Sequence, residues 1–207
     1  MPQVINLLNP KLMKISVKSL AIITCCLSLS ILSNAQLKIS SGIGNDIKKV
    51  ISDYPSRFKN LMGEVISENP QSTDYRCNIK IEGAEETFIT RYSSKKDIYS
   101  WEALMLTTES FDKAKQKFRS LFNQLNNLTV SVPNAGNIHL KGKYESPETE
   151  KKFTSIVFDV SPDVAGYSRL RIGVLMEFQS PMEWKVKIQV YDQEREDNEQ
   201  GVKAESK

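Results

Sequence analysis

The spacing of apolar residues predicts two helical segments. Within residues 44–61 and within 111–125, apolar side chains recur every three or four positions, which places them on one face of a helix. Pro55 interrupts the first segment. Because proline suits the first turn of a new helix, we expect two short helices or one kinked helix, at 44–53 and 55–61, ending near Gly63. Thr108 precedes the second segment and has a side chain that caps helices.

Alternation of apolar and polar residues predicts eight strands, four after each helical segment. They are 63–68, 74–82, 86–92, 98–107, 137–145, 151–160, 167–178 and 182–191. The strand at 98–107 is apolar on both faces, which is typical of a central strand. A tight turn joins the last two strands, so we expect them to pair antiparallel.

This order of elements predicts an α+β fold, an antiparallel β-sheet with helices packed on one face. It also fits two helix-plus-four-strand units, although no obvious residue identity relates the halves. The linkers are short, so we expect residues 36–191 to form a single α+β domain. Residues 192–207 are charged and lack apolar periodicity, which predicts a disordered tail.

Residues 1–35 have the features of a secretory signal peptide. Three lysines precede the apolar run Leu20–Leu32, and small residues follow it at the positions where signal peptidase cuts. The run is shorter than the roughly 20 residues that a membrane-spanning helix needs. We therefore expect cleavage between Ala35 and Gln36, and an exported protein, periplasmic or extracellular, with no integral membrane segment after processing.

Two details of this segment leave alternatives open. Met13 begins a more ordinary signal peptide than Met1 does, so translation could start there. Cys25 and Cys26 would permit a lipoprotein, but cleavage before either would leave an apolar tail exposed on the processed chain. We favour the interpretation in which both cysteines are discarded.

Removal of this segment changes the charge of the chain. The sequence contains 28 Lys and Arg against 25 Asp and Glu, a formal net charge of +3. Three of these lysines and none of the acidic residues lie in residues 1–35, so the processed chain is close to neutral. No global basic field remains to attract phosphates, and we expect no nucleic-acid partner.

Few groups are suited to catalysis. His139 is the only histidine, and its alternation with Ile138 and Leu140 predicts that it faces solvent. Cys77 would be the only cysteine after processing, and its apolar neighbours predict a buried thiol. We therefore expect no catalytic residue, no cofactor and no metal site.

Aromatic and acidic side chains are the candidates for a binding surface. Tyr75, Tyr92, Tyr99 and Trp101 could line one face of the sheet and contact a ligand or partner. Glu102 lies in the most apolar strand of the first half, where a buried carboxylate would mark a site. Partial exposure beside a serine on the same face explains Glu102 equally well, and we favour it.

The chain resembles small exported proteins of Bacteroidota. The resemblance rests on the signal segment that ends in Ser-Asn-Ala before Gln36, and on the phrases DYPSRFKNLMGE and SENPQSTDY. It covers most of the processed chain and contains no diagnostic motif. It implies an envelope location in a Gram-negative host and implies no catalytic residue.

We therefore expect an exported, non-enzymatic binding or interaction domain whose partner is a protein or another envelope component. The sheet face away from the helices should make the contact and present an exposed apolar or aromatic patch. One alternative is a carboxylate-based hydrolase, which requires two acidic side chains about 5–10 Å apart in a cleft. Another is a carrier of a small apolar ligand, which requires an enclosed apolar cavity of about 300 Å³ or more.

Overall fold

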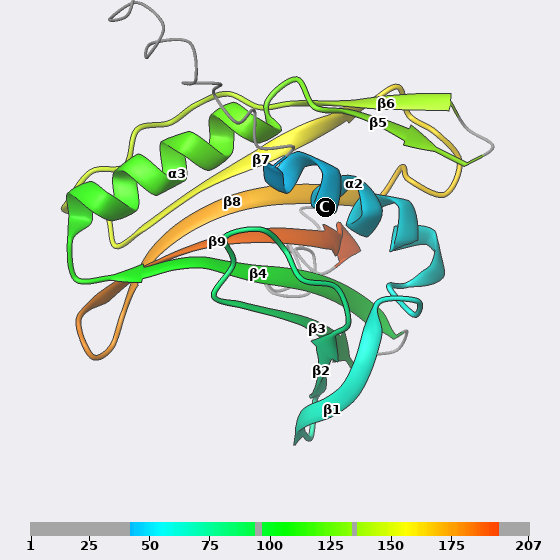
Figure 1. The fold of residues 1–207 in the computed structure, drawn as a ribbon, viewed down its shortest axis with the longest axis horizontal. Coiled ribbons are helices and arrows are strands. Elements are labelled where there is room, and N and C mark those ends of the chain that lie inside the picture. The colour runs from blue at the N-terminus through cyan, green and yellow to red at the C-terminus, as the bar shows by residue number, and fades with distance from the viewer. Residues whose placement is uncertain (1–41, 94–96, 134–135, 195–207) are drawn as a thin grey trace, which may run out of the picture. The chain divides into compact units, whose positions relative to one another are not determined.

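The computed structural model describes residues 42–93, 97–133 and 136–194 of the 207-residue chain. Within them the chain forms two α-helices, a short 3-10 turn and nine strands (Figure 1). In chain order the elements are α2 Gly42–Asp53, η2 Tyr54–Ser56, β1 Met62–Asn69, β2 Ser72–Cys77, β3 Glu86–Tyr92, β4 Ile98–Thr108, α3 Phe111–Leu125, β5 Thr129–Val132, β6 Gly136–Lys141, β7 Phe153–Ser161, β8 Leu170–Gln179 and β9 Glu183–Asp192. The predicted signal peptide and its cleavage site at Ala35 and Gln36 lie outside the described residues.

The nine strands belong to one antiparallel sheet in the order β1-β2-β3-β4-β9-β8-β7-β6-β5. Strands β1–β4 form one meander and β5–β9 form a second, and the pairing of β4 with β9 joins the two. The predicted α+β class is confirmed, although most of the structure is sheet. Strand β4 is central, and β8 and β9 pair antiparallel along their whole length, as predicted.

One face of the sheet carries the hydrophobic core, and we call it the core face. The ladders place Trp101, Val190 and Ile172 side by side on this face across three neighbouring strands. Helix α3 packs here, where the ring of Phe122 stacks on Phe158 with 5.8 Å between centroids. Helix α2 contacts β5 and α3 (Figure 1). Because side chains alternate along a strand, the intervening residues point to the opposite face.

The predicted second short helix at 55–61 is wrong. The 3-10 turn η2 ends at Ser56, and Arg57 and Phe58 follow it with φ angles of 58° and 55°. Both residues are therefore in the left-handed region, which a right-handed helix cannot contain. The Phe58 side chain is fully buried, so the turn directs it into the core instead of extending the helix.

The N-cap of helix α3 is Ser110 and not the predicted Thr108, and an extra strand follows the helix. Ser110 is the N-cap, because its Oγ accepts the Lys113 N–H at 3.4 Å, whereas the Thr108 hydroxyl accepts the Ser110 N–H at 3.2 Å. Residues Thr129–Val132, which belong to none of the predicted strands, form β5 and pair with β6. Five strands therefore follow α3 instead of four.

Two strands end earlier than their alternation predicts. Strand β2 stops at Cys77, and the Asn78 N–H adds one further bond in the same register, to the Leu61 carbonyl at 2.7 Å. Strand β6 stops at Lys141, since the next N–H, that of Gly142, donates to the side chain of Asn126 at 3.0 Å. Alternation alone does not reveal such a competing side chain.

Strand β9 extends to Asp192, so Asp192–Glu194 are not part of a disordered tail as predicted; residues 195–207 lie outside the described residues. Cys77 is buried and His139 exposed, as predicted. Glu102 is buried, which corrects the expectation of partial exposure. Among the helices that the structure describes, none is long and apolar enough to cross a membrane.

Candidate functional site

A pocket of about 330 Å³ lies where four distant segments of the chain meet. They are the turn after α2, the start of β4, the loop before β8 and the end of β9. The lining includes Tyr54, Arg57, Tyr99, Arg169, Asp192 and Glu194. The pocket is open to solvent and combines aromatic rings with charges of both signs, which is typical of sites for small polar ligands.

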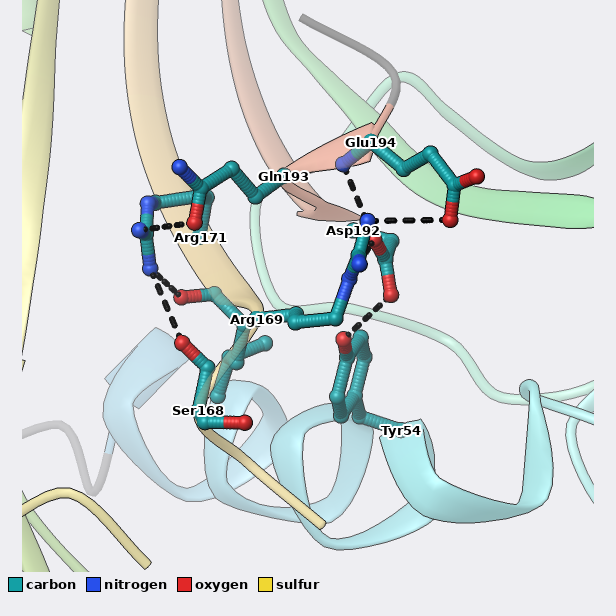
Figure 2. A network of polar contacts seen from close by, with 8 residues as sticks. Tyr54, Ser168, Arg169, Arg171, Asp192, Gln193 and Glu194 are labelled. Carbon is teal, nitrogen blue, oxygen red and sulfur yellow. Dashed lines mark hydrogen bonds and ion pairs between the residues drawn. The ribbon is translucent and has the colours of Figure 1, made fainter. Parts of the chain in front are cut away.

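The carboxylate of Asp192 is the centre of a polar network at this pocket (Figure 2). Its Oδ2 accepts the hydroxyl of Tyr54 at 2.8 Å, and its Oδ1 accepts Nε of Arg169 at 2.9 Å. The same Oδ1 accepts the backbone N–H of Glu194 at 2.9 Å. Arg169 Nη2 also donates to Glu194 Oε2 at 2.9 Å, so both carboxylates are paired with one guanidinium.

These contacts fix the protonation states of the network. Partial burial of Asp192 opposes its ionisation, but hydrogen bonds from Glu194, Tyr54 and Arg169 outweigh burial and hold its pKa below the ordinary value. Burial, and then the hydrogen bond to Asp192, raise the pKa of Tyr54. Asp192 is therefore ionised and Tyr54 protonated throughout the neutral range, which suits a structural support better than a proton-transfer site.

Arg171, two residues after Arg169, also donates hydrogen bonds at this end of the sheet (Figure 2). Its Nη1 donates to the carbonyl of Leu170 at 2.8 Å and to that of Ser168 at 3.5 Å. Its Nη2 donates to the side chain of Gln193. The loop before β8 is thus tied to the residue that follows β9, which holds the pocket wall in place.

The turn that carries Arg57 forms the opposite wall and has an unusual backbone. Two consecutive non-glycine residues in the left-handed region cost about 1–2 kcal/mol each. Asp53 supports the turn: its carbonyl accepts the Phe58 N–H at 3.2 Å, and its carboxylate accepts the Asn60 N–H at 3.1 Å. Strained backbone that the surrounding structure maintains in this way is concentrated at functional sites.

Arg57 is the cation that remains available to a ligand. Its side chain is exposed, and no hydrogen bond or ion pair joins its guanidinium to the residues that the structure describes. Arg169 is neutralised by two carboxylates, whereas Asp97, on another part of the pocket lining, has no ion pair with the described residues. The pocket therefore offers one unpaired positive and one unpaired negative charge.

A second charged cluster lies on the opposite face of the sheet. Lys187 Nζ is 3.1 Å from Glu102 Oε1 and 2.7 Å from Glu177 Oε1, and Gln189 also donates to Glu102. Burial opposes the charge of Lys187, but the two carboxylates outweigh it and raise the pKa of the ammonium group. Each charged group of this cluster has a partner within it, which indicates a structural role.

The structure does not assemble the aromatic surface predicted from the sequence. Tyr75, Tyr99 and Trp101 point to the core face, while Tyr92 and Glu102 point to the opposite face, because the strand register separates them. Trp101 is fully buried and cannot contact a partner. Of these five residues, Tyr99 lines the pocket.

Sequence reasoning missed Tyr54, Arg57, Arg169 and Asp192. Consecutive polar and aromatic residues around a proline at 54–57 were a signal for a turn, but nothing in the sequence shows that Asp192 returns to it. Among the described residues, no group of three or more His, Cys, Asp or Glu side chains is placed to hold a metal ion.

Comparisons with protein families, with curated proteins and with solved structures found no match to this chain.

Proposed function

We propose that this protein is an exported, non-enzymatic binding domain that holds a small zwitterionic ligand in the pocket between η2 and the end of β9. The ligand class is a free amino acid or a dipeptide. The observation on which the proposal rests is the exposed, unpaired guanidinium of Arg57, on a strained turn that lines the same pocket as the ion-paired Arg169, Asp192 and Glu194.

The charges of the pocket favour a zwitterion over a simple anion or cation. A guanidinium such as that of Arg57 binds a carboxylate in a bidentate manner, and Asp97 supplies the matching charge for an ammonium group. The carboxylates of Asp192 and Glu194 make the pocket unfavourable for a ligand that is negative throughout. A volume of about 330 Å³ is at the small end of the range for ligand sites, which fits a ligand of this size.

The same geometry argues against the hydrolase alternative. Paired catalytic carboxylates need one member with a raised pKa that can donate a proton. In both acidic pairs discussed above a cation bridges the two carboxylates: Arg169 between Asp192 and Glu194, and Lys187 between Glu102 and Glu177. The pKa of Asp192 is lowered, which is opposite to what an acid catalyst requires.

The apolar-carrier alternative has less support than the zwitterion site. It requires an enclosed apolar cavity between the helices and the sheet. The pocket of about 330 Å³ and two others among the described residues, of about 380 and 300 Å³, are open and have charged residues in their linings.

Export of the protein to the periplasm or the exterior remains part of this proposal, and the signal-peptide pattern of residues 1–35 supports it. We further propose that both helices cover the core face, and that α2 with β1–β4 and α3 with β5–β9 are related halves. The repeated order of a helix followed by an antiparallel meander supports the second idea.

The test is a thermal-shift and calorimetric screen of the processed protein against free amino acids and dipeptides. Neutral sugars and simple carboxylates serve as the comparison ligands. We expect at least one zwitterion to raise the melting temperature and to bind with a Kd in the micromolar range. Arg57→Ala should abolish this binding, while Lys59→Ala, an exposed cation two residues away and outside the pocket lining, should not.

Two outcomes would contradict the proposal. One is a screen in which no zwitterion binds, and the other is a bound zwitterion whose affinity is the same in the Arg57→Ala and wild-type proteins. Binding of acetate alone with equal strength would show a simple anion site instead.

A further inference from the structure

Part of strand β7 has a neighbouring strand on one side only, although β7 lies within the sheet. Strand β6 pairs with β7 at Asp159, Val160 and Ser161, and the ladder between the two strands ends there. The stretch Phe153–Phe158 is paired with β8 on one side, and on its other side the described residues provide no strand. Open edges of this kind are templates for pairing with another chain.

The direction of the backbone groups on this edge follows from the ladder. The Phe178 N–H donates to the Lys152 carbonyl at 2.8 Å, so residues directly opposite at this register exchange hydrogen bonds. Because antiparallel pairs alternate, the backbone groups of Phe153, Ser155 and Val157 point away from β8 toward the open edge. Their side chains are exposed, at 53% for Phe153 and 42% for Val157.

We propose that two copies of this chain associate through this edge, by antiparallel pairing of β7 with β7 about a two-fold axis at Ser155. In this register Phe153 of each copy lies opposite Val157 of the other, and the two Ser155 residues face each other. The pairing would form about six backbone hydrogen bonds. The stretch Phe153–Phe158 contains no charged residue, so no like charges oppose the contact.

The other edges of the sheet are less suited to a second copy. Strand β1 also exposes two apolar side chains, Val65 and Ile66. A two-fold pairing centred on Ile66 would place Glu64 opposite Glu68, so carboxylates would repel, and two register irregularities bend this strand. Strand β5 has four residues and lies beside α2. The uncharged, self-complementary segment of β7 therefore identifies the occupant as a second copy of this chain.

Sedimentation equilibrium of the processed protein over a wide concentration range tests the proposal. One short strand pair makes a small interface, so we expect a weak, reversible dimer. Ser155→Pro removes the central outward N–H without removing a hydrogen bond of the monomer, and Val157→Lys places two cations at the interface. Each should raise the dissociation constant at least about tenfold. Val65→Lys, an equally exposed change on β1, should leave the dimer unchanged.

Thermal unfolding of each variant establishes that its monomer is folded. If Ser155→Pro does not fold, Val157→Lys still tests the interface, because its side chain is exposed. A protein that remains monomeric up to about millimolar concentration would overturn the proposal, since a dimer with a Kd of about 1 mM would already be populated at that protein concentration. A dimer that Val65→Lys disrupts, or that neither β7 substitution weakens, would also overturn it.

Discussion

Replacement of Lys187 by methionine tests whether the charged cluster on the opposite face stabilises the sheet. The Lys187 side chain is 17% exposed and that of Glu102 is 9% exposed, so both charges are largely removed from water. Methionine has a similar length and keeps the packing of the stem, but it leaves the carboxylates of Glu102 and Glu177 without their cation.

The expected loss of stability is large for a single substitution. Removal of one partner from a buried ion pair costs about 3–5 kcal/mol, because a charge remains buried without compensation. Since all three side chains keep some contact with solvent, we expect the lower end, about 3 kcal/mol. For a domain of this size that corresponds to a decrease in melting temperature of about 6–12 °C.

Urea denaturation at neutral pH measures the loss directly. Lys185→Met is the matched control, since Lys185 lies on the same strand and face and has no ion pair among the described residues. The double variant Glu102→Gln, Lys187→Met should recover part of the stability, because the more buried carboxylate is then neutral.

The pH dependence gives a second measure with a definite sign. The folded pKa of Lys187 is raised, so its stabilisation is fully present below the ordinary value of 10.5 and is lost as the pH rises through the folded pKa. The variant should not show this alkaline loss. A Lys187→Met protein within about 0.5 kcal/mol of wild type, or no less stable than Lys185→Met, would refute the reasoning.

Three further predictions concern other positions. Arg57→Gly should stabilise the fold by about 0.5–1 kcal/mol in urea denaturation, because glycine accepts the left-handed backbone, while ligand binding is lost; a destabilised variant would contradict the strain argument. Gly142→Ala should cost about 1–3 kcal/mol, because its Cβ would lie 2.9 Å from the buried ring of Phe158; an unchanged melting temperature would show that the ring can move. The lowered pKa of Asp192 stabilises the wild-type protein above pH 3.8, the ordinary value, and this stabilisation is lost as the pH falls through the folded pKa. Asp192→Asn should remove this stabilisation. Acid titration of stability should therefore flatten in this variant, and the Tyr54 phenol should ionise at a lower pH, as followed by absorbance; unchanged titrations would contradict both expectations.

The elements of the sheet could be predicted because alternation is a local property. The alternating apolar positions of β8 and β9 identify their core face from the sequence alone, and the structure confirms that these two strands pair. The unpredicted strand β5 has four residues, too few for alternation to separate it from a loop. Its place in the sheet depends on β6, a partner that is not recognisable from β5 itself.

The candidate site could not be predicted for a different reason. Asp192 stands at the start of a charged sequence without periodicity, which is the pattern of a disordered tail. Its three hydrogen bonds come from Tyr54, Arg169 and Glu194, and the first of these is 138 residues away. Glu102 shows the same limit, because its burial depends on Lys187 and Gln189 of a strand from the other end of the chain.

The pairing of β4 with β9 links the folding of the protein to the formation of the pocket. Within each meander, neighbouring strands are also neighbours in the sequence. The two meanders are joined by the pairing of β4 with β9, which are far apart in the sequence. Strand β9 also brings Asp192 to Tyr54, which is 138 residues away in the sequence, so the pocket needs both segments in place. A ligand bound there would contact residues from both ends of the domain, so it would stabilise the folded state relative to partly folded forms in which these ends are apart.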